Sequence, residues 1–411
     1  MSARPERWFV ATSEYAGLTP YTGGIGTHYA GLLPALVSAG ADVDLLVLSP
    51  EPLESDVASG GVVLLDSPTV AGTTVTGLRL RARLVSRAVR SGRYDRLFLP
   101  EWGALGSALR RRAPLLTNLA TSTALQNEVS GFTPASFGWR QGAVQVGQSF
   151  LEDRQIRRSA GVIAISHAMA ERSTRLLGHL PPVRVVPNTV AIDEVRALST
   201  THPLPGWWPG GTGPTLLFVG RLERRKGVLE AMAAFGTLSR THPDAQLVLA
   251  GSTGDARFEP SRADLLRLVP PEARERVHLV GQLSAEQLHP CVRAATVVLS
   301  PSTWEGFGNA ALEAKAVGAA VVVTRGSGFD DFCRDEQDCL MAAPGDADDL
   351  ARALVRLLDD AALRERLGRA ARASSDAYAP DRVAPLLLRA ADELLGPVSQ
   401  APSAASQRRP S

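Results

Sequence analysis

The sequence predicts an α/β protein built from two doubly wound parallel-sheet domains. Short apolar, β-branched segments alternate with helix-like segments along most of the chain, and this alternation is typical of parallel sheets covered by helices. A stretch rich in Pro and Gly at residues 201–214 interrupts the pattern once. The chain of 411 residues is also too long for one ordinary hydrophobic core. We therefore expect two such domains that face each other across a cleft.

The composition is that of an ordinary globular protein, with 45% hydrophobic and 21% charged residues. A formal net charge of +2 gives no support for a nucleic-acid partner. The three cysteines (Cys291, Cys333 and Cys339) lack metal-ligand spacing and fit a reducing compartment. We recognise no signal peptide and no apolar run long enough to span a membrane. We expect a cytoplasmic protein with no metal or other cofactor, and its oligomeric state stays open.

The first half opens with a strand–helix–strand unit around a glycine-rich turn. The turn at residues 22–26 (TGGIG) follows a strand at 8–11 and precedes a helix at 28–39 and a strand at 43–48. It differs from the G-x-G-x-x-G fingerprint, so a nicotinamide cofactor is weakly supported. Two interpretations stay open: a tight turn that needs positive φ, or a backbone platform that faces a diphosphate. Further strands are predicted at 62–65, 97–99, 115–119, 162–166 and 183–188, with helices at 78–93 and 167–177.

Two segments of this half carry side chains that suggest contacts with other molecules. The predicted helix 78–93 has a basic face, which indicates either a solvated surface or weak peripheral contact with anionic lipid. Residues 121–149 are rich in small polar side chains and contain Phe132, Phe137 and Trp139. These rings predict either a platform for an acceptor molecule or a small core within a long loop.

The strand–helix alternation resumes after residue 214. Strands are predicted at 215–219, 246–250, 277–280, 296–300 and 319–324, with helices at 227–238, 285–294, 310–317 and 347–358. We assign residues 1–200 to the first domain, 201–214 to a linker and 215–379 to the second domain. A helix at about 380–395 is expected to join the first domain, and the polar residues 397–411 to form a disordered tail.

The first strand of the second half ends in residues suited to an anionic ligand. Arg221 follows the strand 215–219, and Lys226 lies at the start of the next helix. A guanidinium fork, an ammonium group and nearby helix amides suit a diphosphate. An exposed basic turn without a ligand would have the same composition. A second motif in this half of the chain helps to distinguish a diphosphate site from such a turn.

That second motif spans residues 303–313 (TWEGFGNAALE), between a strand and a helix that we expect Asn309 to cap. Gly308 lets the backbone approach a ligand closely, and the helix N-terminus favours an anion. Glu305 in the loop and Glu313 in the helix are expected to face the same cleft. Two carboxylates beside an anion site suit hydroxyl groups, which sugar and ribose supply.

These segments together resemble the large family of retaining, nucleotide-sugar-dependent glycosyltransferases with the two-domain GT-B fold (family 4, or group 1). The resemblance rests on V-G-R-L-x-x-x-K-G at residues 219–227, S-P-S-x-x-E-G-F-G-N at 300–309, and Glu313. The turn at 22–26 and V-V-P-N at 185–188 are also similar to that family. The resemblance covers most of the chain and is most specific at 215–345.

The resemblance implies retaining transfer of a sugar from a nucleotide-diphosphate sugar, the co-substrate, to an acceptor hydroxyl without a metal. The residues implied in catalysis are Arg221, Lys226 and Glu305. Those implied in donor binding are Gly23, Gly24, Asn188, Phe307, Gly308, Asn309 and Glu313. Acceptor contacts are expected from Asn118, Thr121 and Trp139.

The acceptor is expected to be a soluble small molecule, as in aminoglycoside-like natural-product pathways or the biosynthesis of secondary glycosides. The alternatives are a membrane-associated transferase that acts on a lipid or cell-envelope acceptor, and a non-catalytic nucleotide-sugar-binding protein. One position departs from the family pattern: many members carry a His after the strand at 115–119, where this chain has Ala120. The hypothesis is an altered contact to the donor sugar, for a deoxy or otherwise modified sugar, or a role moved to Asn118 or Thr121.

Overall fold

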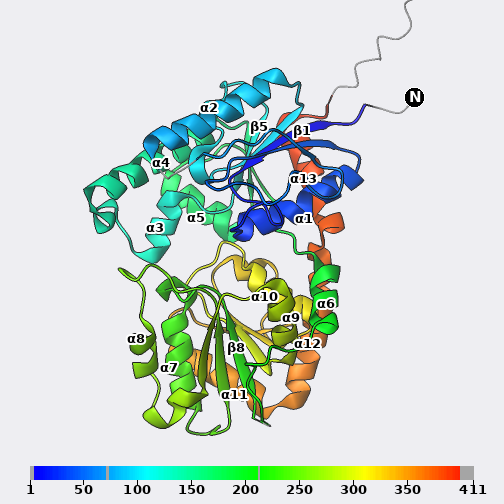
Figure 1. Ribbon diagram of the computed structural model, residues 1–411. Helices are drawn as coiled ribbons and strands as arrows, with labels where there is room; N and C mark the ends of the chain where they lie inside the picture. Colours follow the sequence, from blue (N-terminus) through cyan, green and yellow to red (C-terminus); the bar gives the residue numbers. More distant parts are fainter. Residues whose placement is uncertain (1–3, 71–73, 212, 399–411) are drawn as a thin grey trace, which may run out of the picture.

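The computed structural model describes residues 4–70, 74–211 and 213–398. In this part of the chain two parallel sheets, each flanked by helices, form two domains stacked one above the other (Figure 1). The predicted fold class, two doubly wound α/β domains of the GT-B type, is confirmed. The strand order is β3-β2-β1-β4-β5-β6-β7 in the first sheet and β10-β9-β8-β11-β12-β13 in the second. In each sheet the order reverses beside the first strand, and such a reversal opens a crevice at the carboxyl ends of the strands.

The first sheet is built from short strands whose side chains are mostly buried, as expected for a sheet covered on both faces. The strands are β1 Arg7–Thr12, β2 Asp42–Val47, β3 Val63–Leu64, β4 Arg96–Pro100, β5 Leu115–Leu119, β6 Gly161–Ala164 and β7 Val183–Val185. The helices of this half are α1 Gly24–Ser38, α2 Val75–Ser91, α3 Thr123–Ser130, α4 Gly138–Arg158, α5 His167–Leu177 and α6 Ile192–Thr201. Two 3-10 turns, Trp102–Ala104 and Pro134–Phe137, connect them.

The second sheet follows the same construction. Its strands are β8 Thr215–Val219, β9 Gln246–Ala250, β10 Val277–Gly281, β11 Val297–Ser300, β12 Val321–Thr324 and β13 Leu340–Ala342. Its helices are α7 Val228–Leu238, α8 Arg262–Arg267, α9 Ala285–Ala294, α10 Asn309–Val317, α11 Ala347–Asp359 and α12 Ala361–Ser375. The 3-10 turns are Arg224–Lys226, Pro271–Arg276, Gly328–Asp331 and Asp376–Tyr378.

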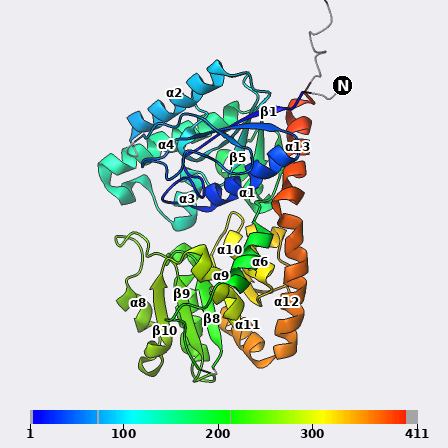
Figure 2. The ribbon, with the colours of Figure 1, turned by 45° about the vertical axis from the view of Figure 1, so that its right-hand side comes forward.

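The last helix, α13 (Pro380–Leu395), packs on the first domain. Its buried side chains Val383, Leu387 and Ala391 recur at helical spacing and join one apolar core with Trp8 and Leu32. Each such fully buried leucine contributes roughly 1.5–3 kcal/mol to folding. Figure 2 shows α12 and α13 following one another along one side of the molecule, so this side connects the two domains.

The chain crosses to the second domain earlier than the sequence suggested. Helix α6 lies in the segment that we assigned to the first domain, but it packs against α9 of the second, with Ile192 and Val195 buried. The Arg196 side chain also donates to the carbonyl of Ala316 in α10, at 3.0 Å from Nε. The crossing therefore precedes α6, and the Pro- and Gly-rich stretch at 201–214 follows it. Residue 212 lies outside the described residues.

The segment 121–149 is mostly helical, whereas its polar composition suggested a loop. Helices α3 and α4 make up most of it: Leu125 of α3 is buried in an apolar core, and Gly142 of α4 is buried against Pro134. The polar residues are accommodated because Glu152 of α4 is buried among donors, which include the Thr123 backbone N–H at 2.7 Å. Most of the expected tail, residues 399–411, lies outside the described residues. None of the helices that the structure describes is long and apolar enough to cross a membrane.

Candidate active site

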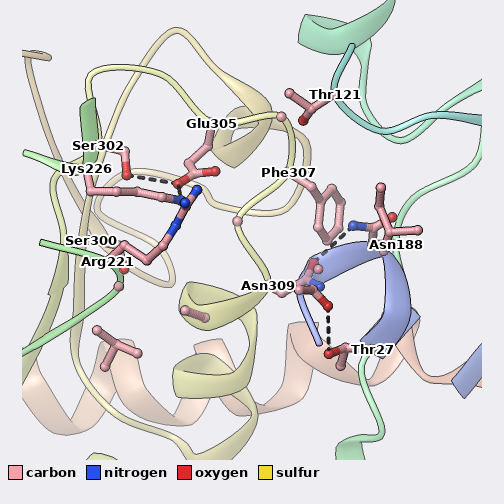
Figure 3. Close-up of a pocket in the computed structure, with 18 of the residues that line it drawn as sticks. Thr27, Thr121, Asn188, Arg221, Lys226, Ser300, Ser302, Glu305, Phe307 and Asn309 are labelled. Atoms are coloured by element: carbon pink, nitrogen blue, oxygen red, sulfur yellow. Dashed lines mark hydrogen bonds and ion pairs between the residues drawn. The ribbon is translucent and has the colours of Figure 1, made fainter. Parts of the chain in front are cut away.

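A cavity of about 630 Å³ lies between the two domains, at the carboxyl ends of their strands. In the second domain it is lined by residues that follow β8, β9 and β11, so it opens at the β8–β11 reversal. In the first domain it is lined by the β1–α1 loop and by residues after β5. Figure 3 shows how these side chains converge from the two domains. The cavity has the size of an ordinary small-molecule site.

An ion pair between Lys226 and Glu305 marks the second-domain wall of this cavity (Figure 3). Lys226 ends the 3-10 turn after β8, and Glu305 lies in the loop after β11. The hydroxyl of Ser302 also donates to the Glu305 carboxylate, with Oγ 3.0 Å from Oε1. The two neighbouring strands thus hold a carboxylate and an ammonium group in fixed positions before any ligand arrives.

The surroundings of this pair are net positive. Burial opposes the charge of Glu305, but the cations of Lys226 and Arg225 outweigh that effect and lower its pKa. Burial and the nearby Arg225 and Arg221 likewise lower the pKa of Lys226, although Glu305 opposes them. An anion placed here would relieve the repulsion among the three cations, so the wall is suited to bind one.

Glu223 orients the arginines of this wall. Its carboxylate pairs with Arg221, 2.8 Å from Nη1 to Oε1, and with Arg225, 3.1 Å from Nε to Oε2. Both arginines line the cavity. Glu223 and Arg225 were not predicted as site residues, although a carboxylate between arginines in R-L-E-R-R (residues 221–225) was a usable signal.

Helix α10 points its N-terminus into the cavity. Its N-cap is Gly308, with φ of +109°, and the residues Asn309, Ala310 and Ala311 line the wall. Asn309 was expected to cap the helix but instead opens it, and its Oδ1 accepts from Asn188 Nδ2 of the first domain at 3.1 Å. The N–H of Ala311 donates to the Gly308 carbonyl at 3.1 Å, so the N–H groups of Asn309 and Ala310 are the ones left for an anion, which the helix dipole also favours.

Glu313, one turn further into α10, also lines the cavity. Burial raises the pKa of its carboxyl group to about 7, and no cation among the described residues compensates it. A part-buried carboxylate without a partner is costly unless a ligand supplies hydrogen-bond donors. The two acidic groups of the motif therefore differ: Glu305 is neutralised by the protein, and Glu313 is open to a ligand.

The glycine-rich turn of the first domain forms the opposite wall. Helix α1 begins at Gly24 with Gly23 as its N-cap at φ −100°, so the interpretation as a turn with positive φ is wrong. The Glu14 carboxylate accepts the backbone N–H groups of Gly23 at 3.0 Å and Gly26 at 2.9 Å. A side chain at Gly26 would place its Cβ 2.8 Å from Thr22, which explains that glycine. The Gly23 amide thus already has a protein partner, while Gly24 faces Asn309 across the cavity.

Contacts across the domain interface surround the cavity. The hydroxyl of Ser166 donates to the carbonyl of Gly306 at 2.6 Å, and the N–H of His167 donates to Asp331 at 3.0 Å. Within the first half of the chain, His28 is buried at the cavity wall and its Nδ1 accepts the Thr189 backbone N–H at 3.0 Å. Burial lowers the pKa of His28 to about 3, so its ring is neutral. The structure therefore shows the two domains closed on each other.

The three residues expected at the acceptor lie in different places. Asn118 lines the cavity, but its amide is engaged by Tyr29 and the Ile163 carbonyl, each at 3.3 Å. Thr121 also lines the cavity, near Phe307 in Figure 3. Trp139 does not join them: it is 80% exposed at the start of α4 and lies outside the cavity lining. Sequence alone suggested a loop here, and the helix carries this ring outward.

Ala120, the position that departs from the family pattern, lines the cavity between Asn118 and Thr121. Its backbone N–H donates to the buried carboxylate of Glu101 at 2.9 Å. Burial raises the pKa of Glu101 to about 8. Within the residues that the structure describes, no group of three or more His, Cys, Asp or Glu side chains is placed to hold a metal ion.

Two domains of this topology, with cations, a helix N-terminus and an unpaired carboxylate in the cleft between them, define a GT-B glycosyltransferase. Two family models match the chain: "Glycosyl transferases group 1" at residues 209–374 and "Glycosyl transferase 4-like domain" at residues 23–189. The protein is an enzyme that belongs to the group 1 (family 4) glycosyltransferases.

Among curated relatives, the glycogen synthase of Mycobacterium tuberculosis is 30% identical over 382 residues, which cover 85% of this chain and 86% of the relative. The 2-deoxystreptamine glucosyltransferase of Streptomyces kanamyceticus is 31% identical over 216 residues, 50% of this chain and 53% of that protein.

Solved structures share the fold. Sucrose-phosphate synthase from Thermosynechococcus elongatus superposes with a TM-score of 0.75 at 23% identity, covering 95% of this chain and 99% of that one. The Anabaena protein HepE, solved in complex with UDP and glucose, gives a TM-score of 0.65 at 17% identity, covering 94% of this chain and all (100%) of that one.

Proposed function

We propose that this enzyme transfers a sugar from a nucleotide-diphosphate sugar to a hydroxyl group of a soluble, polyhydroxylated small molecule. The observation that carries this proposal is the arrangement of charge in one cavity between the two domains. Arginine, lysine and a helix N-terminus lie together, and the unpaired carboxylate of Glu313 lies one helical turn away. A nucleotide sugar offers the complementary order of groups, because its diphosphate lies between two hydroxyl-bearing rings. The HepE structure, which holds UDP and glucose, supports this class of donor.

In the pose we infer, the diphosphate lies between Arg221, Lys226 and the first amides of α10. Glu313 accepts hydrogen bonds from the ribose hydroxyls, which satisfies its buried carboxylate. Glu305 and the backbone of residues 307–309 contact the transferred sugar. The first domain contributes Gly24 and the Asn188–Asn309 contact, while the amide of Gly23 stays with Glu14.

The chemistry follows from that pose. The bond between the anomeric carbon and the diphosphate oxygen breaks, and negative charge builds up on the departing nucleoside diphosphate. Arg221 and Lys226 stabilise this charge, and fixed groups of this kind contribute about 10²–10³-fold to a rate. The acceptor hydroxyl attacks from the same face and its proton passes to the departing phosphate oxygen, so the anomeric configuration is retained. The two cations supply the positive charge that the leaving group needs, and we propose no metal or other cofactor.

Closure of the domains protects the donor from water. Contacts such as Ser166–Gly306 and Asn188–Asn309 join residues of the two domains beside the cavity. Excluding water strengthens the electrostatic interactions and suppresses hydrolysis of the donor. We therefore expect the donor to bind before the cleft closes and the acceptor hydroxyl to take the place of water.

The names of two relatives support a polyhydroxylated acceptor. One is a glycogen synthase and the other a 2-deoxystreptamine glucosyltransferase, so we propose a carbohydrate or a cyclitol for this chain as well. Thr121 and Asn118 lie on the first-domain wall where that acceptor would enter. The cytoplasmic location stays a prediction.

The direct test is turnover. The purified enzyme is incubated with UDP-, dTDP-, GDP- and ADP-sugars and a panel of sugars and cyclitols, and release of the nucleoside diphosphate is measured. We expect release with one nucleotide class that rises when an acceptor is added, and an anomeric coupling in the NMR spectrum of the product that matches the donor. Binding of a donor without any turnover would instead identify a non-catalytic nucleotide-sugar-binding protein.

A second candidate, a membrane-associated transferase, is favoured by one exposed surface. On α4, Trp139, Val146 and Phe150 are 80%, 55% and 65% exposed and fall on one face. The neighbouring α2 exposes Leu80 and Arg83. Aromatic side chains beside arginines suit an anionic bilayer surface. Flotation with phosphatidylglycerol vesicles separates the candidates: comigration that Phe150→Ala abolishes would favour a lipid acceptor, and no comigration favours a soluble one.

A further inference from the structure

A second cavity, of about 360 Å³, opens beside the first. We call it the side cavity. Both domains line it, through α3, α4 and residues 132–137 on one side and residues 252–259 on the other. It shares part of its lining with the donor cavity, namely Tyr21, Trp102, Gln126, Arg221 and Ser252. A ligand that reaches the donor cavity can therefore extend into the side cavity without leaving the protein.

One wall of the side cavity carries side-chain amides whose hydrogen-bonding groups are only partly satisfied by the protein. Gln126 and Asn127 belong to α3, and Gln145 belongs to α4. Asn127 Nδ2 donates to Gln145 Oε1 at 3.3 Å, which leaves the Asn127 oxygen and the Gln145 nitrogen without a partner among the described residues. Such a wall offers both a donor and an acceptor, which is what a hydroxyl group uses.

The outer wall is aromatic and joins the domains. Phe258 of the second domain packs against Phe132 and Phe137 of the first, with ring centroids 4.7 and 5.4 Å apart. Trp102 adds a ring on the boundary with the donor cavity. Aromatic faces pack well on the apolar C–H face of a sugar or cyclitol ring, and the amides meet its hydroxyl edge.

The carboxylates around the side cavity already have partners. Asp255 pairs with the Arg257 side chain, 3.0 Å from Nε to Oδ1, and Glu259 accepts the backbone N–H of Arg224 at 2.7 Å. Glu223 holds Arg221 and Arg225. A cationic ligand would find these charges engaged, so the free groups favour a neutral ligand with several hydroxyls.

We propose that the side cavity is an acceptor subsite for a neutral sugar or cyclitol ring, next to the ring that receives the transferred sugar. The proposal rests on the proposed function and makes it narrower, because acceptors with at least two rings should bind better than single rings. It also explains why the subsite needs the closed molecule: the amides come from the first domain, and Phe258 and the 252–259 loop from the second.

The test measures binding of glucose, maltose, cellobiose and trehalose by ligand-observed NMR. It uses the full chain saturated with whichever of UDP, dTDP, GDP or ADP stabilises it most in a thermal-shift assay. We expect at least one disaccharide to bind about 10-fold tighter than glucose. In Asn127→Ala and Gln145→Ala the affinity for this disaccharide should fall about 3- to 10-fold, the range for a lost hydrogen bond. The affinities for glucose and for the nucleotide should be unchanged. Both residues lie outside the donor cavity lining.

The matched control is Gln141→Ala, which removes an exposed amide from the same helix α4. It should leave every affinity unchanged. The proposal of a subsite would be overturned if no disaccharide binds more tightly than glucose. It would also be overturned if the preference for a disaccharide survives both amide substitutions. Failure of the proposed function is seen separately, as the absence of stabilisation by any of the four nucleotides.

Discussion

At the residue scale, the chemistry depends on which charges the protein neutralises and which it leaves for a ligand. The positions of Arg221, Lys226, Glu305 and Glu313 could be predicted from the sequence, because the first three follow strand ends and Glu313 lies in the first turns of a helix. All four line one cavity. Their unequal states could not be predicted, because these depend on Ser302, Arg225 and burial, which only the folded chain brings together.

Removing the ammonium group of Lys226 should slow transfer far more than it weakens folding. In Lys226→Ala the departing diphosphate loses one fixed positive charge, so we expect kcat to fall about 10²–10³-fold. Arg240→Ala, which removes an exposed cation of the same domain, is the control and should retain full activity. Steady-state kinetics with circular dichroism as a check on folding measures both. Equal activity of the two variants would remove Lys226 from the mechanism.

The carboxyl group of Glu313 should make stability depend on pH. Burial raises its pKa from 4.5 to about 7, so between these values the folded protein holds a proton that the unfolded chain has lost. Glu313 should therefore make the free energy of unfolding decline by roughly 1–3 kcal/mol as pH rises from about 5 to 7. Burial also raises the pKa of Glu101 and Glu152, so Glu313→Gln should show a shallower decline than the parent rather than none. Melting temperatures of the nucleotide-free proteins at pH 5, 6, 7 and 8 measure it, and parallel profiles would contradict the assignment.

Ala120 tests the hypothesis of an altered donor contact. Ala120 lines the cavity together with Asn118 and Thr121, so we expect a larger polar side chain there to meet the transferred sugar. We expect Ala120→His to change the kcat/KM ratio for hexose over 6-deoxyhexose donors by about 10-fold, the effect of one hydrogen bond. If competition assays show the same kcat/KM ratio in Ala120→His and in the parent, the hypothesis of an altered donor contact is wrong.

At the scale of elements, strands were easier to predict than the helices between domains. Strand β5 and helix α5 have the predicted bounds because apolar runs and Ser166, which caps α5, define them locally. Helix α6 was missed because its three buried positions are few, and its packing surface belongs to the other domain. Helix α4 was missed because polar residues such as Gln148 and Glu152 are buried in a network that composition does not reveal.

The junction between loop and helix at Gly308 should tolerate no side chain. Its φ is +109°, and an added Cβ would lie 2.3 Å from the ring of Phe329. Gly308→Ala should cost about 2 kcal/mol or more of stability and weaken nucleotide binding, because the first amides of α10 shift. Gly131→Ala is the control: φ is +69° there but nothing lies within 4 Å, so only the roughly 1–2 kcal/mol of backbone strain applies. Urea unfolding and nucleotide titration compare them, and similar costs with intact binding in both would contradict this role.

At the scale of the whole molecule, the site exists only where two domains meet. The sequence could predict two parallel-sheet domains from the repeated alternation and a cleft from the strand ends. It could not predict the closed arrangement, because contacts such as Ser166–Gly306 and Asn188–Asn309 join residues more than 100 positions apart. The crossing at α6 was likewise visible only in the folded chain, whereas the return of the chain at α13 was expected from the sequence (Figure 2).

The aromatic contact around Phe258 should help to hold the molecule closed. It packs on Phe132 and Phe137 across the interface, and an aromatic pair of this kind contributes about 0.5–1.5 kcal/mol. Phe258→Ala should raise the radius of gyration of the nucleotide-free protein in small-angle scattering, and a bound nucleotide should reverse part of the change. Phe150→Ala, which removes an exposed ring, should scatter like the parent, and identical curves for both variants would show that the contact does not control closure.

The measurement that tests the central claim most directly is a thermal-shift titration with UDP-, dTDP-, GDP- and ADP-sugars. It is run on the parent protein, Arg221→Ala, Glu313→Ala and the control Arg240→Ala. We predict that one nucleotide class, at 100 times its Kd, stabilises the parent and the control by about 2.7 kcal/mol, and that both cavity variants lose this stabilisation. No stabilisation by any donor, or stabilisation that survives both cavity substitutions, would contradict the claim that this cleft binds the nucleotide sugar.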